Sequence, residues 1–505
     1  MNRLLFVLLA ISLGVSACAP ARLERLKEPQ GVIQTEEADL SRAFDGASDP
    51  DAMYALGRWV EAAYREGAAG RPVRVANHLV HFHPGGPDTY APGYFDTLEP
   101  VASYVAYGLV DHLILGVGVP MAGYRENKQR LPMEKWYPRE GIARAVTAVA
   151  TPGGQRGGLR EVEIRLYKRT STENVLAGDK RQRLAADFTV PWAMLLAKTH
   201  ATEAYGLTTV VSEKAAVDPC FYLMEEYDPQ RTPLILIHGM FSTQLAWAQL
   251  TNELWADPLI RQRYQIWHYL YPTNAPPLYS AWIMRGQLDK LRKALDPDQK
   301  DPAMRRAVVV SHSMGGLLAK SLVVEPRGAF WNAVFKKPMS EMNLTPAERA
   351  AMQEAFFWKP RPYVDRVIFC SVPFGGDTSA GFWLGKVGKH LMVPDRRFSE
   401  FYDEIAKKNP GAFQPPYDRL TGKQVNSLVD LDPKRRSLEV FRELPIIPGT
   451  ATHVIKGSFD MVVSSKSSDL PGAESTMTVR SAHATFRNRE AIVEIRRILA
   501  LPPHH

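Results

Sequence analysis

Runs of consecutive apolar residues alternate with amphipathic stretches through the C-terminal part of the chain. The clearest runs are residues 234–237, 307–310 and 367–369, and strands of a parallel sheet read this way because both faces of the sheet are covered. Between the first two runs, apolar residues at 279–295 recur with helical spacing. This alternation predicts an α/β fold with a doubly wound, mostly parallel sheet over residues 206–505.

Two further strands are expected at the start of this domain, at residues 208–212 and 221–226. Two later connections, residues 325–362 and 379–450, are longer than strand-to-strand connections require. Large apolar side chains in the first insertion form either a lid or acyl pocket, or the core of a subdomain. They are Phe330, Trp331, Phe335, Met339, Phe356, Phe357 and Trp358.

The pattern changes in the N-terminal part. Residues 36–205 are predicted to form an α+β domain, and the sequence does not indicate its function. Residues 37–66 have helical spacing. Residues 141–150 and 159–169 read as two strands, joined by a long glycine-rich turn at 151–158.

The extreme N-terminus reads as a targeting segment over residues 1–18. Arg3 precedes a short apolar core, which ends in the small residues before Cys18. This ending resembles a bacterial lipobox, which implies cleavage before Cys18 and lipidation of that residue. The alternative is an ordinary secretory signal with an incidental cysteine.

Ala19 follows the cysteine, and by resemblance to sorted lipoproteins this favours the outer membrane of the cell envelope, facing the periplasm. Residues 19–35 are expected to be a polar linker. The membrane partner is then contacted through lipidated Cys18, because the rest of the chain lacks a second apolar stretch long enough to span a bilayer.

The composition, with 45% hydrophobic and 23% charged residues, is typical of a globular protein and adds little to the prediction. The net charge of +8 is spread thinly and forms no basic cluster interleaved with aromatic residues, so no nucleic-acid partner is expected. Cys220 and Cys370 are compatible with one disulfide in an oxidising compartment. A buried free thiol is the commoner state for Cys370, which lies in an apolar run. The oligomeric state is not indicated.

The sharpest chemical signal is Ser313, where the apolar run 307–310 breaks into a helix-like segment. A nucleophilic serine on such a tight strand-to-helix turn needs small residues two positions before and after it, and Ser311 and Gly315 meet this need. Upstream, the apolar run 234–237 is followed directly by His238 and Gly239, a place for a loop whose N–H groups face an oxyanion.

These motifs resemble those of the α/β-hydrolase superfamily, in particular its lipase-like and esterase-like members, over residues 206–501. The family pattern at the serine is usually G-x-S-x-G, and Ser311 departs from it. The resemblance implies that the backbone N–H groups of Met240 and Met314 form the oxyanion hole. His238 is expected to be structural and to brace this loop.

The resemblance also implies a triad in the chain order serine, acid, histidine. Asp460 directly follows a predicted strand at residues 453–459, and a further predicted strand at 476–480 leads through Ser481 and Ala482 to His483. Asp460 is then the acid and His483 the base, although Met461 stands where relatives often carry glycine.

Other candidates for these roles remain. Asp377 is an alternative acid. His453 and His312 are alternative bases, but His312 is adjacent to the nucleophile and is expected to point elsewhere.

Together these residues predict a serine hydrolase that cleaves carboxylic esters through an acyl-serine intermediate. The aromatic insertion and the membrane tether favour lipid-like esters. The alternatives are an acyltransferase that uses the same triad, or a non-catalytic envelope lipoprotein that binds a ligand.

No cofactor or metal is required by this mechanism. One histidine-rich stretch is a weaker candidate for a metal site. The alternative interpretation is an ordinary strand followed by a turn. The residues of this stretch are His78, His81, His83 and Asp88.

Overall fold

The computed structural model describes residues 21–26, 50–67, 70–177, 180–199, 218–375, 392–432 and 435–504. These residues belong to two compact units. The N-terminal unit runs to residue 199 and also contains residues 251–262, while the C-terminal unit comprises residues 218–250 and 263–504. The sequence pattern places residues 251–262 in the second domain, whereas in the structure they belong to the N-terminal unit.

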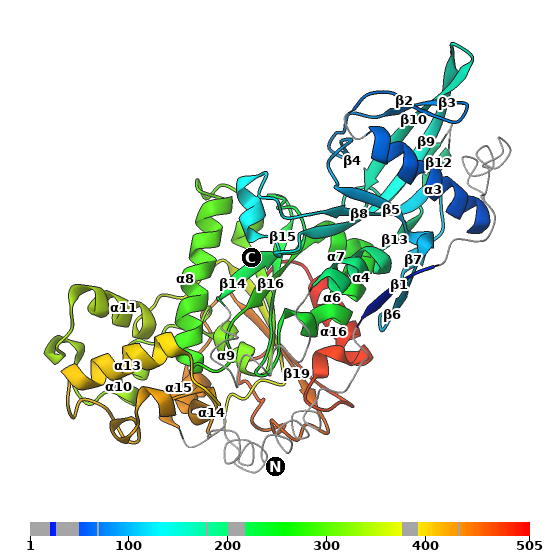
Figure 1. The fold of residues 1–505 in the computed structure, drawn as a ribbon. Coiled ribbons are helices and arrows are strands. Elements are labelled where there is room, and N and C mark those ends of the chain that lie inside the picture. Colours follow the sequence, from blue (N-terminus) through cyan, green and yellow to red (C-terminus); the bar gives the residue numbers. More distant parts are fainter. Residues whose placement is uncertain are drawn as a thin grey trace, which may run out of the picture. The chain divides into compact units, whose positions relative to one another are not determined.

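The C-terminal unit is built on a seven-stranded sheet in the order β14-β16-β15-β17-β18-β19-β20 (Figure 1). All neighbours are parallel except β14, which runs antiparallel to β16 at one edge. The strands are β14 (Cys220–Leu223), β15 (Thr232–Ile237), β16 (Tyr264–Leu270), β17 (Ala307–His312), β18 (Val364–Cys370), β19 (Ala451–Gly457) and β20 (Ser475–Val479). The predicted mostly parallel α/β fold is therefore confirmed; the expected strand at 208–212 lies outside the described residues.

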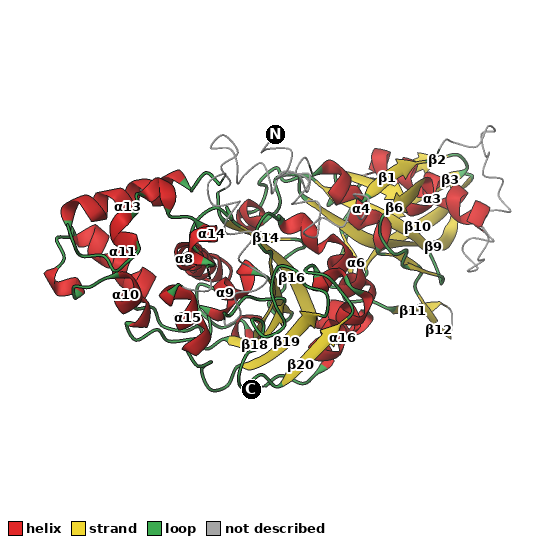
Figure 2. Cartoon of the chain, turned by 90° about the horizontal axis from the view of Figure 1, so that it is seen from below, coloured by secondary structure: helices red, strands yellow, loops and turns green. Residues whose placement is uncertain are grey.

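Helices on both faces explain why the central strands contain long apolar runs. The helices α8 (Pro277–Leu295) and α9 (Met314–Lys320) cover one face, and α16 (Arg489–Ala500) lies against the other (Figures 1 and 2). Every residue of β17 and β18 is buried as a result.

The two predicted insertions form helices that gather beside α8 in both views (Figures 1 and 2). We call them together the insertion subdomain, residues 325–362 and 392–443. Its helices are α10 (Ala329–Val334), α11 (Pro346–Phe356), α13 (Arg396–Lys408), α14 (Ser427–Asp430) and α15 (Arg436–Glu443).

Most of the aromatic residues of the first insertion pack on one another inside this subdomain. The rings of Trp331 and Phe335 stack at 4.2 Å, and Phe330 contacts Phe441 of α15 at 4.6 Å. Most of these aromatic residues therefore form the core of a subdomain, which is one of the two predicted alternatives. Phe335 and Phe356 also line a pocket.

The N-terminal unit combines helices with a mixed sheet, in the order β2-β3-β10-β9-β8-β5, with β4 paired to β10. Helix α3 (Pro50–Gly67) packs on this sheet through Trp59, Val60 and Tyr64. The strands are β2 (Val73–Val75), β3 (His78–Phe82), β4 (Thr89–Tyr90), β5 (Thr97–Pro100), β8 (Val119–Arg125), β9 (Ile142–Arg156) and β10 (Leu159–Lys168).

Shorter elements complete the described chain. They are β1 (Arg22–Arg25), β6 (Tyr104–Tyr107), β7 (Leu113–Ile114), β11 (Asn174–Ala177), β12 (Lys180–Arg183), β13 (Ala186–Asp187), α4 (Thr189–Lys198), α6 (Ala248–Ala256) and α7 (Pro258–Arg263).

Two predictions for the N-terminal part are wrong in detail. The expected linker at 19–35 contains strand β1, which pairs antiparallel with β6. The expected long turn at 151–158 is mostly strand, because β9 continues to Arg156. The turn itself is the pair Gly157 and Gly158, whose φ angles of +59° and +80° suit a tight two-residue hairpin.

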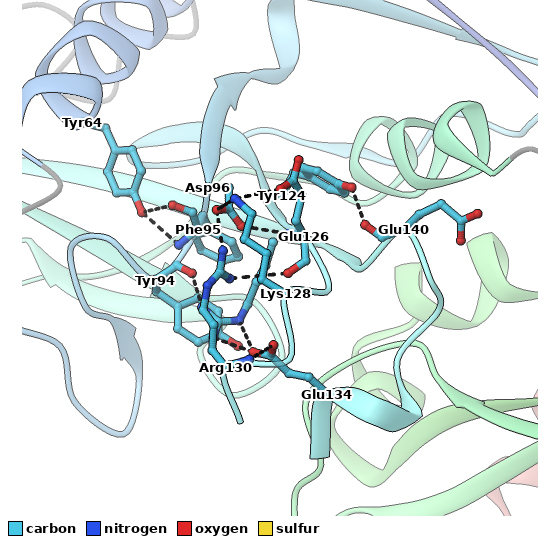
Figure 3. A network of polar contacts seen from close by, with 11 residues as sticks. Tyr64, Tyr94, Phe95, Asp96, Tyr124, Glu126, Lys128, Arg130, Glu134 and Glu140 are labelled. Carbon is cyan, nitrogen blue, oxygen red and sulfur yellow. Dashed lines mark hydrogen bonds and ion pairs between the residues drawn. The ribbon is translucent and has the colours of Figure 1, made fainter. Parts of the chain in front are cut away.

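A polar network fixes the loop between β8 and β9 in this unit (Figure 3). Glu134 is fully buried, and its carboxylate forms an ion pair with Arg125 at 2.6 Å. Arg130 and Lys128 both donate to the Asp96 carboxylate, at 2.5 and 2.8 Å. Burial raises the pKa of Asp96, but these hydrogen bonds outweigh it and lower the pKa to about 2. The network anchors the loop and contributes no residue to the site described next.

Candidate active site

Ser313 sits between the last residue of β17 and the first residue of α9, in a backbone conformation that L residues rarely adopt. Its φ is +51° and its ψ is −128°. A strained turn of this kind pushes the side chain out beyond the carboxyl end of the strand. The hydroxyl is thereby presented at the edge of the sheet where the loops of the neighbouring strands meet.

The small neighbours of Ser313 are required by close packing. A Cβ added to Gly315 would lie 2.3 Å from the His238 carbonyl oxygen, a distance no side chain tolerates. Ser311, the departure from the usual glycine, fits because its buried Oγ donates to the Ile368 carbonyl at 3.2 Å. The departure therefore leaves the turn intact.

The structure brings Ser313, His483 and Asp460 together although 170 residues separate the serine from the histidine. His483 Nε2 lies 2.9 Å from Ser313 Oγ, and His483 Nδ1 lies 2.9 Å from Asp460 Oδ2. The side chain of Asp460 is 2% exposed and that of His483 12%. This is the order of contacts that a serine, base and acid need.

Asp460 is held in place by its own loop. Its Oδ1 accepts the backbone N–H groups of Val462 and Val463, both at 2.9 Å, which leaves Oδ2 for His483. Burial raises the pKa of Asp460, but the hydrogen bonds from His483 and the two N–H groups outweigh burial and lower it. Met461 points into solvent, 80% exposed, so the missing glycine does not disturb this loop.

The loop that follows β15 passes directly beside the nucleophile. A Cβ on Gly239 would lie 2.9 Å from the Cβ of Ser313. Met240 follows in this loop, and Met314 is the first residue of α9, so its N–H belongs to a helix N-terminus. Among the described residues neither N–H donates a hydrogen bond to another protein group, and both remain candidates for an oxyanion.

His238 braces that loop, as the sequence predicts. Its ring is fully buried, stacks on Tyr271 at 4.5 Å and lies 2.9 Å, through Nδ1, from the Gly239 carbonyl. Tyr271 also donates its hydroxyl to the His238 carbonyl at 2.8 Å. Burial lowers the pKa of His238 to about 4, so the ring stays neutral.

His312 does not point away from the site, and that prediction is wrong. Its Nε2 lies 2.9 Å from the backbone carbonyl of His483, and its ring packs against the His483 and Phe486 rings at 4.7 Å. A Cβ on Gly239 would lie 2.7 Å from its Nδ1. Burial, followed by the nearby His483, lowers the pKa of His312 well below its usual range.

Sequence reasoning missed this contact because it joins residues 171 positions apart. The tripeptide around Ser313 carries no signal for it. Only the fold brings the loop of His483 back over the nucleophile turn.

The remaining candidates lie elsewhere or outside the described residues. His453 bonds to Ser475 Oγ at 2.8 Å and not to Ser313. Asp377 and Cys18 fall outside the described ranges. Cys220 and Cys370 are both free thiols.

The possible metal site of the N-terminal unit does not form. Within the part of the chain that the structure describes, no cluster of three or more His, Cys, Asp or Glu side chains is placed to hold a metal ion. His81 instead lies 3.6 Å from Glu161 on the neighbouring strand.

Comparison with known proteins assigns the family. The family model described as "Alpha/beta hydrolase family" matches residues 234–494, more than half of the chain. The chain therefore belongs to the alpha/beta hydrolase family. No curated protein matches it.

A search of solved structures finds similarity to esterases and a lipase. The mature lipase BlEst2 of Bacillus licheniformis is 14% identical, with 55% of this chain and 95% of that one covered and a TM-score of 0.31. A carboxylesterase structure from Nitrososphaera gargenis is 13% identical, over 56% and 95% of the two chains, with a TM-score of 0.29. A putative aryl esterase from Burkholderia cenocepacia is 13% identical, over 58% and 98%, with a TM-score of 0.29.

Proposed function

We propose that this protein is a serine hydrolase that cleaves carboxylic esters through an acyl-serine intermediate. The observation that carries the proposal is the unbroken line of two 2.9 Å contacts from Ser313 Oγ through His483 to Asp460. A serine hydroxyl becomes nucleophilic at neutral pH when such a base takes its proton during attack.

In the first half of the reaction, Ser313 Oγ attacks the ester carbonyl carbon while His483 Nε2 takes the hydroxyl proton. The negative charge that develops on the carbonyl oxygen is stabilised by the N–H groups of Met240 and Met314. Asp460 keeps Nδ1 protonated and stabilises the imidazolium. When the carbon–oxygen bond breaks, His483 passes its proton to the leaving alcohol.

In the second half, a water molecule takes the place of the alcohol. His483 removes a proton from that water as its oxygen attacks the acyl carbon, and the same two N–H groups stabilise the oxyanion. Collapse of the intermediate returns the proton to Ser313 Oγ and releases the carboxylic acid. An acyltransferase would differ only in the acceptor, an alcohol other than water.

His312 is proposed as a positioning residue. Its hydrogen bond to the His483 backbone carbonyl fixes the loop that carries the base, and its contact with Gly239 joins this loop to the oxyanion side. Because the buried ring stays neutral, it adds no charge beside the imidazolium that forms on His483.

We further propose lipid-like esters as substrates and the cell envelope as location, with the protein attached through lipidated Cys18 to the outer membrane and facing the periplasm. The targeting segment and the apolar insertion support this assignment. In the described part of the chain, none of the helices has the length and apolar character needed to cross a membrane. The proposed attachment is the lipid on Cys18.

A fluorophosphonate probe tests the proposal directly, since it reacts with an activated serine. Wild type and Ser311→Ala, the matched control on the same turn, should be labelled, whereas Ser313→Ala should not. Folded wild-type protein that takes no label would contradict the proposal and favour a non-catalytic binding lipoprotein. Product analysis with added alcohols then separates hydrolysis from acyl transfer.

A further inference from the structure

Exposed apolar side chains gather in one segment of the N-terminal unit. Eleven large apolar side chains are exposed in the described part of the chain, and four of them fall within residues 107–115. They are Tyr107, Val110, Leu113 and Leu115, each between 48% and 65% exposed, and we call them the apolar patch. Single exposed apolar residues are ordinary, whereas such a concentration is typical of a surface that binds a partner.

The backbone that carries the apolar patch is fixed by hydrogen bonds. Thr189, at the start of α4, donates its hydroxyl to the Val110 carbonyl at 2.9 Å and accepts the His112 N–H at 3.0 Å. The next residues form β7, which pairs with β13. Side chains two positions apart along an extended strand point to the same side, so Leu113 and Leu115 project together. An ordered backbone therefore holds these side chains in water.

Strand β1 connects the apolar patch to the proposed anchor. It pairs antiparallel with β6, and Arg22 lies directly opposite Tyr107 (Figure 1). Cys18, the proposed lipidation site, is four positions before Arg22. Four fully extended residues span at most about 14 Å. A lipid on Cys18 would therefore keep Tyr107 close to the surface of the bilayer.

The residues beside the apolar patch suit the boundary between membrane and water. Arg22 and Tyr107 are cross-strand partners, so their side chains share one face of the strand pair, and both are exposed. Both side chains end an apolar stem in a polar tip, which suits them to the headgroup level. Asp111 is the only acidic residue within 107–115, and a carboxylate is costly inside hydrocarbon. The patch is therefore suited to the headgroup boundary and not to deep insertion.

We propose that the apolar patch binds the surface of the lipid bilayer that holds the anchor, and that it orients the N-terminal unit on the membrane. This rests on the proposed location in the cell envelope. The side chains of the patch enter the headgroup region beside the point where the chain leaves the lipid. A surface this small binds reversibly, so the lipid on Cys18 still retains the protein in the membrane fraction.

Vesicle binding tests the apolar patch separately from the anchor. Residues 19–505 carry both units but neither the targeting segment nor a lipid. This chain is titrated with vesicles of phosphatidylethanolamine and phosphatidylglycerol in a molar ratio of about 3:1, which present an anionic surface, and bound protein is measured by sedimentation. We expect binding that persists in high salt, because salt screens charges but does not oppose apolar burial. Absence of binding, or binding that high salt abolishes, would overturn the proposal.

A pair of substitutions identifies the surface that binds. Leu113→Gln/Leu115→Gln should weaken vesicle binding at least fivefold, since the amides remove apolar surface without adding charge. Leu131→Gln/Leu176→Gln makes the same change at two exposed positions outside the patch and should bind like the unsubstituted chain. Equal affinity of the two variants would overturn the proposal. If the first variant does not fold, Leu115→Gln alone takes its place and should weaken binding at least twofold.

A protein partner for the apolar patch would give different results. The patch faces water when no membrane is present, so Leu113→Gln/Leu115→Gln should keep the Tm of the unsubstituted chain. A lower Tm would show that protein covers these side chains. A dimer that forms without vesicles and that this variant dissociates would assign the patch to a second copy of the chain. Either result would overturn the proposal.

Failure of the proposed function is distinguishable from failure of the apolar patch. Wild type that hydrolyses no ester would refute the hydrolase, and an unmodified Cys18 in the exported protein would refute the anchor. Vesicle binding by residues 19–505 is measured independently of both. Leu113→Gln/Leu115→Gln should hydrolyse methyl butanoate at the wild-type rate, and lost hydrolysis by this folded variant would contradict a role confined to the membrane.

Discussion

Ser313 shows how much the local sequence is shaped by one backbone conformation. A non-glycine residue at a φ of +51° costs on the order of 1–3 kcal/mol and persists only where its surroundings enforce it. Gly315 and Gly316 permit this, because Cβ atoms there would collide with the His238 carbonyl and with Val372. The strain is stored where the proposed nucleophile is presented.

Asp460→Asn should leave the fold intact and lower the kcat for ester hydrolysis by roughly 10⁴-fold, because an amide favours the wrong imidazole tautomer. Steady-state hydrolysis of methyl butanoate measures this. Asp469→Asn, which removes a more exposed carboxylate from the same loop region, is the control and should be near wild type. A loss smaller than tenfold would reassign the acid.

His312→Ala should lower kcat by about 10²-fold with little change in KM, since a small displacement of the base costs that much. His312→Gln, whose amide can still donate to the His483 carbonyl, should recover part of the loss. Because the His312 ring is neutral, the reduction should be similar at pH 6 and pH 8. Equal kcat for both variants and wild type would remove the positioning role.

At the scale of elements, helix α14 joins two parts of the C-terminal unit. It ends at Asp430, beside Tyr417, and its Leu428 packs toward the loop that follows β15. The carboxylate is buried, and burial raises its pKa more than the Tyr417 hydroxyl and the charge of Arg435 lower it. Its ionisation should therefore affect the stability of the insertion subdomain.

The sign of this effect follows from the direction of the shift. Burial raises the folded-state pKa of Asp430 from its ordinary 3.8 to about 6, so the folded protein favours the protonated form. Its contribution to the free energy of unfolding is fully present below about pH 4. It is lost as the pH rises through about 6, and the total loss is up to about 3 kcal/mol.

Asp430→Asn cannot titrate, so it should match wild type near pH 4 and be more stable at pH 8. Denaturant unfolding of the two proteins across this range measures the difference. Asp418→Asn, on the surface nearby, is the control for losing a carboxylate and should leave the pH profile of wild type unchanged. A constant difference between Asp430→Asn and wild type would contradict the argument.

At the scale of the whole molecule, the C-terminal unit holds every proposed catalytic residue. Residues 251–262 leave this unit and belong to the N-terminal one, so the N-terminal unit is not a simple appendage at one end of the chain. We expect both units to be exported together behind the targeting segment.

Cys18→Ser should release the protein from the membrane fraction of a bacterial host while ester hydrolysis is retained, because the proposed anchor is the lipid on this cysteine. Fractionation and mass measurement of the N-terminal peptide test this. Cys220→Ser should remain in the membrane fraction. Membrane attachment of unlipidated Cys18→Ser would show that another part of the chain binds the membrane.

The sequence by itself determined the features that depend on local order. The apolar runs of β15, β17 and β18 follow from burial on both faces, and the turn at Ser313 follows from small residues at fixed positions. Resemblance of these motifs to a family indicated Asp460 and His483. The alternation of strands and helices predicted the sheet.

The tertiary structure alone decided what depends on residues that are distant in sequence. The His312 contact spans 171 positions, and β1 gains strand structure only by pairing with β6. The aromatic residues of the first insertion became partly core and partly pocket wall because α8 and α13 pack beside them. A pattern along the chain encodes which face of an element is apolar, whereas its partner is chosen by packing in three dimensions.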